Sequence, residues 1–243
     1  VAPSATATPT CVPLSEGFDD ITTLPGAGWV QDNNSSPAGT GVWFQGNSNV
    51  FPSQAGAPNS YIAVNFQSGS GLSTLSNWLL TPTVTLQNGA TLSFWTRTTD
   101  GMFPDRLQVR MSTNGSSVNV GTAATDVGDF ATLLLEINPT YTSTGYPIEW
   151  TQFTVTVSGV ASPSTGRLAF RYFVENGGPS GANSDYIGID TVQYDCSGPT
   201  PTPTDTPTPT ATATDTPTPT ATATDTPTPT AKATDTPTPT ATA

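Results

Sequence analysis

The side chains best suited to chemistry in this sequence are carboxylates, because none of its 243 residues is a histidine. Without an imidazole the chain cannot form a Ser-His-Asp triad, a Cys-His pair or a His-ligated zinc site. Two pairs of aspartates lie close together in the sequence, Asp100 with Asp105 and Asp126 with Asp129. A glycosidase holds two carboxyl groups at a defined separation, and neither pair can be placed across a cleft from its spacing. We therefore predict that the chain is not an enzyme.

The two cysteines, Cys11 and Cys196, enclose the apolar part of the sequence. A bridge between them would join the first strand to the last and would indicate an oxidising compartment. For so long a loop the chain-entropy estimate is about 4–5 kcal/mol of stability. Two unpaired buried thiols are the alternative. We predict a disulfide and an extracellular or cell-surface location.

One aromatic residue is a candidate for ligand binding. Trp43 lies in a segment rich in Gly, Asn and Ser, residues 31–70. An exposed ring on such a loop could stack on the face of a sugar, whereas tryptophan in all-β domains more often packs in the core. Both alternatives stay open for Trp43.

The elements that must position these residues are strands. Between the cysteines, apolar residues recur with a period of two, which is typical of half-buried strands. We expect strands on both sides of a tight Asn88-Gly89 turn. Only residues 130–137 could form a helical turn, which Asn138-Pro139 would end. The pattern predicts an antiparallel β-sandwich (jelly roll) with little helix. The expected strands are residues 83–86, 90–95, 107–111, 153–157, 168–174 and 186–194.

Composition divides the chain into a Thr/Ala/Pro-rich arm (residues 1–10), a folded domain (11–196) and a tail (197–243). The tail repeats the sequence TDTPTPTATA, whose prolines exclude a helix or central strand and favour polyproline II. Thr- and Pro-rich tracts are typical of O-glycosylated stalks, and a bare disordered linker is the alternative. The predicted glycan acceptors are Thr202, Thr204, Thr206, Thr208 and Thr210.

The formal net charge of −12 argues against a nucleic-acid partner, because phosphate backbones would be repelled. Lys232 is the only lysine and the arginines do not cluster, so an anionic membrane surface is also disfavoured. No apolar run approaches the roughly 18 residues of a membrane span. We expect neither nucleic-acid binding nor membrane insertion.

Several short motifs follow one another along the chain. They are Ser15-Glu16-Gly17-Phe18-Asp19-Asp20, Leu24-Pro25, Gly28-Trp29, Trp78-Leu79-Leu80-Thr81-Pro82, Leu92-Ser93-Phe94-Trp95, Asp105-Arg106-Leu107-Gln108-Val109 and Asp185-Tyr186-Ile187-Gly188-Ile189-Asp190. With these motifs the chain resembles the choice-of-anchor J domains, which are similar to bacterial cleaved-adhesin and MAM-like jelly-roll domains. The resemblance covers nearly all of residues 11–196 and implies a jelly roll that serves as an adhesive, carbohydrate-binding or structural module.

The resemblance also implies a calcium site where the first and last strands meet, built from the oxygen ligands that calcium prefers. The matching positions are Glu16, Asp19 and Asp190, and Asp20 and Asp185 are further candidate ligands. The family commonly has paired acidic residues near its end, whereas here Thr191 follows Asp190. Acidic residues that cap turns are the alternative to a metal site.

Two functions are predicted. The first is a non-enzymatic structural or adhesive surface protein, glycosylated on its tail, which polymerises through its termini into an extracellular filament. The second is a monomeric carbohydrate-binding or cell-adhesion module tethered to the cell surface by its stalk. The expected partners are accordingly further copies of the chain or glycans.

Overall fold

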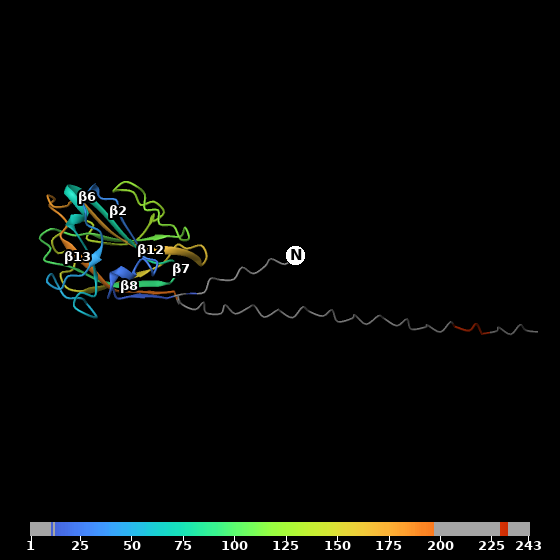
Figure 1. Cartoon of the computed structure of the whole chain (residues 1–243). Coiled ribbons are helices and arrows are strands. Elements are labelled where there is room, and N and C mark those ends of the chain that lie inside the picture. Colours follow the sequence, from blue (N-terminus) through green and yellow to red (C-terminus); the bar gives the residue numbers. More distant parts are fainter. Residues whose placement is uncertain (1–10, 12, 197–228, 233–243) are drawn as a thin grey trace, which may run out of the picture. The chain divides into compact units, whose positions relative to one another are not determined.

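The computed structural model describes residues 11, 13–196 and 229–232 (Figure 1). The chain divides into two compact units, Val1–Thr200 and Pro201–Ala243. The described residues of the second unit, 229–232, are exposed and have no regular secondary structure. The predicted arm, residues 1–10, and the five predicted glycan acceptors lie outside the described residues.

The first of two antiparallel sheets has six strands. Their order is β11-β8-β13-β5-β4, and β1 pairs with the later part of β13, next to β5. Burial alternates residue by residue along β8, which is the period expected for a strand with one face in the core. The strands are β1 (Leu14–Glu16), β4 (Phe44–Gln45), β5 (Ile62–Asn65), β8 (Thr91–Thr98), β11 (Thr151–Thr156) and β13 (Tyr186–Asp195).

The second sheet has seven strands in the order β10-β9-β12-β6-β2, with β3 paired to β6 and β7 paired to β12. Two short 3₁₀ helices, η1 (Ile21–Thr23) and η2 (Phe66–Ser68), lie in connections. Within the described residues no helix is long and apolar enough to cross a membrane. The strands are β2 (Val30–Asn33), β3 (Ser36–Ala38), β6 (Gly69–Leu80), β7 (Val84–Leu86), β9 (Leu107–Ser112), β10 (Thr132–Ile137) and β12 (Ser164–Gly177).

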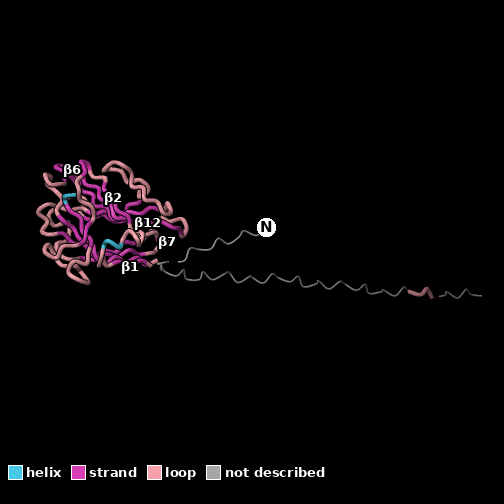
Figure 2. Tube along the Cα trace, in the orientation of Figure 1, coloured by secondary structure: helices cyan, strands magenta, loops and turns pink. Residues whose placement is uncertain are grey.

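The two sheets pack face to face around one main core (Figures 1 and 2). Phe94 of β8 meets Phe170 of β12 edge to face, with 4.9 Å between ring centroids. Strands β6 and β12 are also buried on their outer side, because a smaller cluster forms where Phe130, from the β9–β10 connection, packs against Trp78. The predicted antiparallel β-sandwich is confirmed.

The Asn88-Gly89 turn joins β7 to β8, but the two strands do not pair. An Asn-Gly turn usually joins paired strands, whereas β7 pairs with β12 and β8 pairs with β11 and β13. The Asn88 side chain instead exchanges two hydrogen bonds of 2.9 Å with the backbone of Val160. The turn therefore carries the chain from one sheet to the other.

Residues 130–137, the one segment whose sequence allowed a helical turn, do not form one. This segment contains β10, which pairs with β9 at the edge of the seven-stranded sheet. The local helix propensity of its leucines is overridden by the backbone hydrogen bonds to β9. Asn138 follows the strand with a left-handed φ of 56°, a conformation that asparagine tolerates better than most residues.

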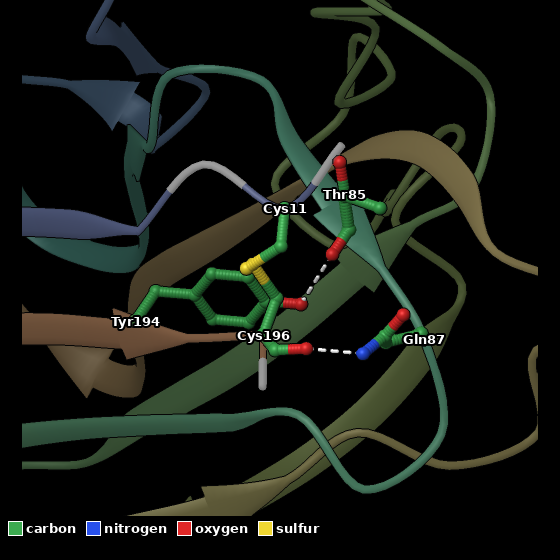
Figure 3. The surroundings of a disulfide bond; sticks show 5 residues. All are labelled: Cys11, Thr85, Gln87, Tyr194 and Cys196. Atoms are coloured by element: carbon green, nitrogen blue, oxygen red, sulfur yellow. Dashed lines mark hydrogen bonds between the residues drawn. A yellow bond between two sulfur atoms is a disulfide. The ribbon is translucent and has the colours of Figure 1, made fainter. Parts of the chain in front are cut away.

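The predicted Cys11–Cys196 disulfide is confirmed (Figure 3). The Cα atoms are 5.7 Å apart, and no cysteine is free. Close by, Gln87 Nε2 donates to the Cys196 carbonyl, and the Tyr194 hydroxyl donates to the Thr85 carbonyl at 2.8 Å. The bridge therefore fastens the first and last strands where β1 lies beside β13.

Candidate functional site

A pocket of about 160 Å³ opens where three connections meet at one end of the sandwich. The connections are η2, the β8–β9 loop and the β12–β13 loop. We call it the Phe66–Phe103 pocket. Its lining residues are Phe66, Phe103, Gly178, Pro179, Gly181, Ser184 and Asp185.

The pocket and the disulfide lie at opposite ends of β13. Strand β13 begins at Tyr186, directly after the pocket residue Asp185, and ends at Asp195, directly before Cys196. Ten residues of strand span about 30 Å. The chain therefore enters and leaves the sandwich at the end that is remote from the pocket.

Phe103 is an aromatic residue of the pocket that does not belong to the hydrophobic core. The β8–β9 loop turns at Gly101, whose φ of 76° is left-handed, and Met102 N donates to Asp100 Oδ1 at 2.9 Å. This turn leaves Met102 and Phe103 at 71% and 42% exposure. The half-buried Phe66 also lines the pocket, so the site contains two aromatic side chains that can contact a ligand.

Asp185 supplies the charged group of the pocket. Its carboxylate accepts a hydrogen bond from Thr99 Oγ1. Burial raises the pKa of Asp185, the Thr99 hydrogen bond lowers it, and the negative charge of Asp100 raises it again. The remaining acceptor positions can take hydroxyl or amino groups of a ligand.

Asp105 does not line the pocket but is hydrogen-bonded to the pocket residue Asp185. Its carboxylate is fully buried and accepts hydrogen bonds from Thr98 Oγ1, the Tyr172 hydroxyl and Asp185 N, the last at 2.8 Å. Burial raises the pKa of Asp105 to about 6, although these hydrogen bonds lower it. Beside it, Ser184 N donates to the Pro104 carbonyl at 3.0 Å. These bonds hold the β8–β9 and β12–β13 loops in one arrangement.

The structure does not gather the predicted calcium ligands into one group. Glu16 Oε1 accepts from Phe18 N at 2.8 Å, while Asp19 is exposed, with Oδ1 beside Gly56. Asp20 caps η1 by accepting from Thr22 N at 2.9 Å. Among the described residues, no cluster of three or more His, Cys, Asp or Glu could hold a metal ion.

The Asp190 carboxylate makes four hydrogen bonds within the described part of the chain. Oδ2 accepts from Gln54 N and Ala55 N at 2.8 and 3.1 Å, and Oδ1 accepts from Thr191 N at 2.6 Å and from its hydroxyl at 3.2 Å. Burial raises the pKa of this carboxyl, and the same hydrogen bonds lower it. Asp190 therefore anchors residues 53–60 to β13. Calcium binding by Glu16, Asp19 and Asp190 stays a prediction.

We expect Asp190→Ala to lower the free energy of unfolding by about 1–3 kcal/mol, because it removes a buried carboxylate that accepts from three partly buried or exposed backbone donors. Urea denaturation measures the loss, and amide exchange at Gln54 and Ala55 localises it. Asp129→Ala is the control, since Asp129 sits on the rim of a loop and accepts from Asn114 and Ser117. Equal losses in the two variants would contradict the anchoring role.

The other predicted residues have structural roles. Trp43 is 1% exposed and packs in the main core, so its ring is not available to a sugar and the ligand-binding prediction is corrected. Asp126 accepts from Thr122 N and Ala123 N and so shapes the loop that also contains Asp129. Of the positions predicted from the sequence, Asp185 alone lines the pocket.

Sequence reasoning missed Phe66 and Phe103. A signal for Phe103 was present, because Met102 and Phe103 are adjacent apolar residues between Gly101 and Pro104, which are turn formers. Apolar residues in a turn are not on the core-facing side of a strand, so this pair could be expected to be exposed. Phe66 lies directly after β5, where the sequence alone does not distinguish a strand residue from a residue of the following turn.

Comparisons with known proteins agree with this architecture. The profile of the family described as Cleaved Adhesin Domain matches residues 11–193. The K1 cleaved adhesin domain of Lys-gingipain from Porphyromonas gingivalis W83 is 24% identical and has a TM-score of 0.52, with 77% of this chain and 99% of that domain covered. The K2 domain of Lys-gingipain is 18% identical, with a TM-score of 0.50 and coverage of 75% and 99%. No curated protein sequence matches the chain.

Proposed function

Because the chain belongs to the cleaved adhesin domain family, we propose that it is a non-catalytic extracellular adhesion module that binds neutral carbohydrate in the Phe66–Phe103 pocket. The observation that carries this proposal is the pocket, in which two aromatic rings and a hydrogen-bonded carboxylate line the same space. Carbohydrate sites need flat apolar surfaces for the C–H faces of a sugar and a few placed polar groups for its hydroxyls.

The charge of the site favours neutral over acidic sugars. Asp185 lines the pocket and Asp100 lies near enough to raise the pKa of Asp185. The formal net charge of the whole chain is −12. Sialic and uronic acids would be repelled by this field, whereas neutral hydroxyls can donate to the Asp185 carboxylate.

The placement of the site suits a tethered module. The sandwich is entered at Cys11 and left at Cys196, at the far end of β13 from the pocket. The segments that flank the sandwich therefore do not begin beside the ligand. The disulfide supports a location outside the cell, because such bonds persist in oxidising compartments.

We expect Phe103→Ala to weaken glycan binding about tenfold or more, because an aromatic contact contributes about 1.5 kcal/mol. The measurement is binding of the labelled full chain to an array of neutral and acidic glycans, followed by titration of the best binder. Leu133→Ala on β10 is a matched control, since Leu133 and Phe103 are 43% and 42% exposed. Absence of binding across the array, or equal binding by both variants, would overturn the proposal.

The finer predictions remain open to experiment. Polymerisation through the termini and O-glycosylation of the tail depend on residues outside the described part of the chain. The narrower assignment to the choice-of-anchor J domains and the calcium site likewise stay predictions.

A further inference from the structure

A second hollow adjoins the Phe66–Phe103 pocket. Pro179 lines both, and Gln67 of the second hollow directly follows Phe66 of the first. The shared wall is held against the start of β6, because Ser180 N donates to the Gly71 carbonyl at 3.2 Å. The second hollow is lined by Ala38, Gly39, Thr40, Gln67, Gly69, Ser70 and Pro179.

The second hollow is polar, and no charged side chain lines it. The side chains of Thr40, Gln67 and Ser70 are exposed, and none of these three side chains makes a hydrogen bond within the described part of the chain, although the backbones of Gln67 and Ser70 do. Their hydroxyl and amide groups can both donate and accept. The hollow therefore suits a ligand that carries many uncharged hydroxyl groups.

The backbone around these groups is already fixed. Gly39 N donates to the Ser68 carbonyl and Gly41 N donates to the Gln67 carbonyl, both at 2.9 Å. These bonds fasten residues 39–41 to η2, so Thr40 and Gln67 lie on joined segments. A ligand would order few further backbone atoms on binding, which favours affinity.

The sizes of the two hollows also favour their joint use. The Phe66–Phe103 pocket has about 160 Å³ and the second hollow about 340 Å³. Sites that enclose most of a small-molecule ligand usually have about 300–1,000 Å³. The first pocket alone falls below this range, the second hollow alone lies near its lower limit, and the two together fall well within it.

We propose that the two hollows form one groove for a neutral oligosaccharide of at least two sugar units, one stacked on Phe66 and Phe103 and the next hydrogen-bonded by Thr40, Gln67 and Ser70. This inference rests on the proposed carbohydrate binding of the first pocket. It adds a requirement for chain length.

The test is isothermal titration calorimetry of the full chain with galactose, mannose and N-acetylglucosamine and with their β-1,4-linked di- and tetrasaccharides. For the series that binds, we expect the disaccharide to bind about five- to tenfold more tightly than the monosaccharide, through hydrogen bonds to the second unit. Gln67→Ala should reduce this gain, so that it weakens disaccharide binding more than monosaccharide binding. Gln152→Ala is the matched control, because Gln152 is an exposed glutamine on β11 that lines neither hollow.

The outcomes separate the groove from the pocket. Affinity that does not depend on chain length, or a Gln67→Ala variant that weakens mono- and disaccharide equally, would overturn the groove and leave the pocket standing. Loss of all binding in Phe103→Ala, with chain-length dependence in the wild type, supports both. Failure of every sugar to bind would overturn the proposed function and the groove with it.

Discussion

Replacing both cysteines by serine should lower the free energy of unfolding by about 3–5 kcal/mol. The bridge joins residues that are 185 positions apart, and closing so long a loop strongly restricts the unfolded chain. It also secures β1, which has only three residues and pairs with the end of β13. Urea denaturation of Cys11→Ser/Cys196→Ser and of the wild type measures the difference, and the m-value should rise because the unfolded variant is less compact.

Two controls show whether the effect belongs to the bridge. Wild-type protein unfolded under reducing conditions should match the double variant, which should itself be insensitive to reductant. Glycan affinity below the unfolding transition should be unchanged, because the pocket lies at the other end of β13. A loss of stability below about 1 kcal/mol would contradict the role assigned to the disulfide.

Much of the fold could be predicted because local patterns determine it. Residues 186–194 were predicted as a closing strand that is buried at its centre, and they lie in β13, which has neighbours on both sides. The bracketing of the apolar region by Cys11 and Cys196 predicted the bridge. The Asn88-Gly89 turn shows the limit, because the same local turn can join paired strands or strands of different sheets.

The candidate site could not be predicted in this way because it depends on convergence of distant loops. Phe66, Phe103 and Asp185 come from three connections, and no local pattern relates them. Trp43 illustrates the opposite case, since its Gly- and Asn-rich surroundings indicate a loop while the structure places its ring in the core. Exposure of an aromatic ring is a long-range property, decided by what packs over it.

Asp105→Asn should keep the fold and glycan binding, whereas Asp105→Leu should damage both. In the asparagine variant, Oδ1 still accepts from the Tyr172 hydroxyl and Asp185 N, and the amide can donate to Thr98 Oγ1. Thr98 can accept this bond because its own hydroxyl also reaches the Tyr186 carbonyl, at 3.1 Å. Leucine leaves the donors of Tyr172 and Asp185 buried and unpaired, at a cost of about 1–3 kcal/mol each.

Glycan affinity shows whether Asp105 positions the pocket or only stabilises the fold. If Asp105 positions the pocket through Asp185 N, Asp105→Leu should lower glycan affinity at temperatures where it remains folded, and Asp105→Asn should restore it. Asp190→Ala is the matched control, because it removes another buried carboxylate that touches no pocket residue. Equal affinities for Asp105→Leu and the wild type would show that Asp105 stabilises the sandwich without shaping the site.

The pH dependence of stability gives an independent readout of Asp105. Its pKa is about 6 in the folded chain against 3.8 for the unperturbed group, so the folded state binds more protons between these values. The stability that this group contributes is therefore complete below pH 3.8 and is lost as the pH rises through about 6, a change of about 3 kcal/mol. Asp105→Asn cannot titrate, while the other carboxylates titrate alike in both proteins. The stability of the variant relative to the wild type should thus increase between pH 3.5 and 7.5, and a flat difference would show that Asp105 has an ordinary pKa.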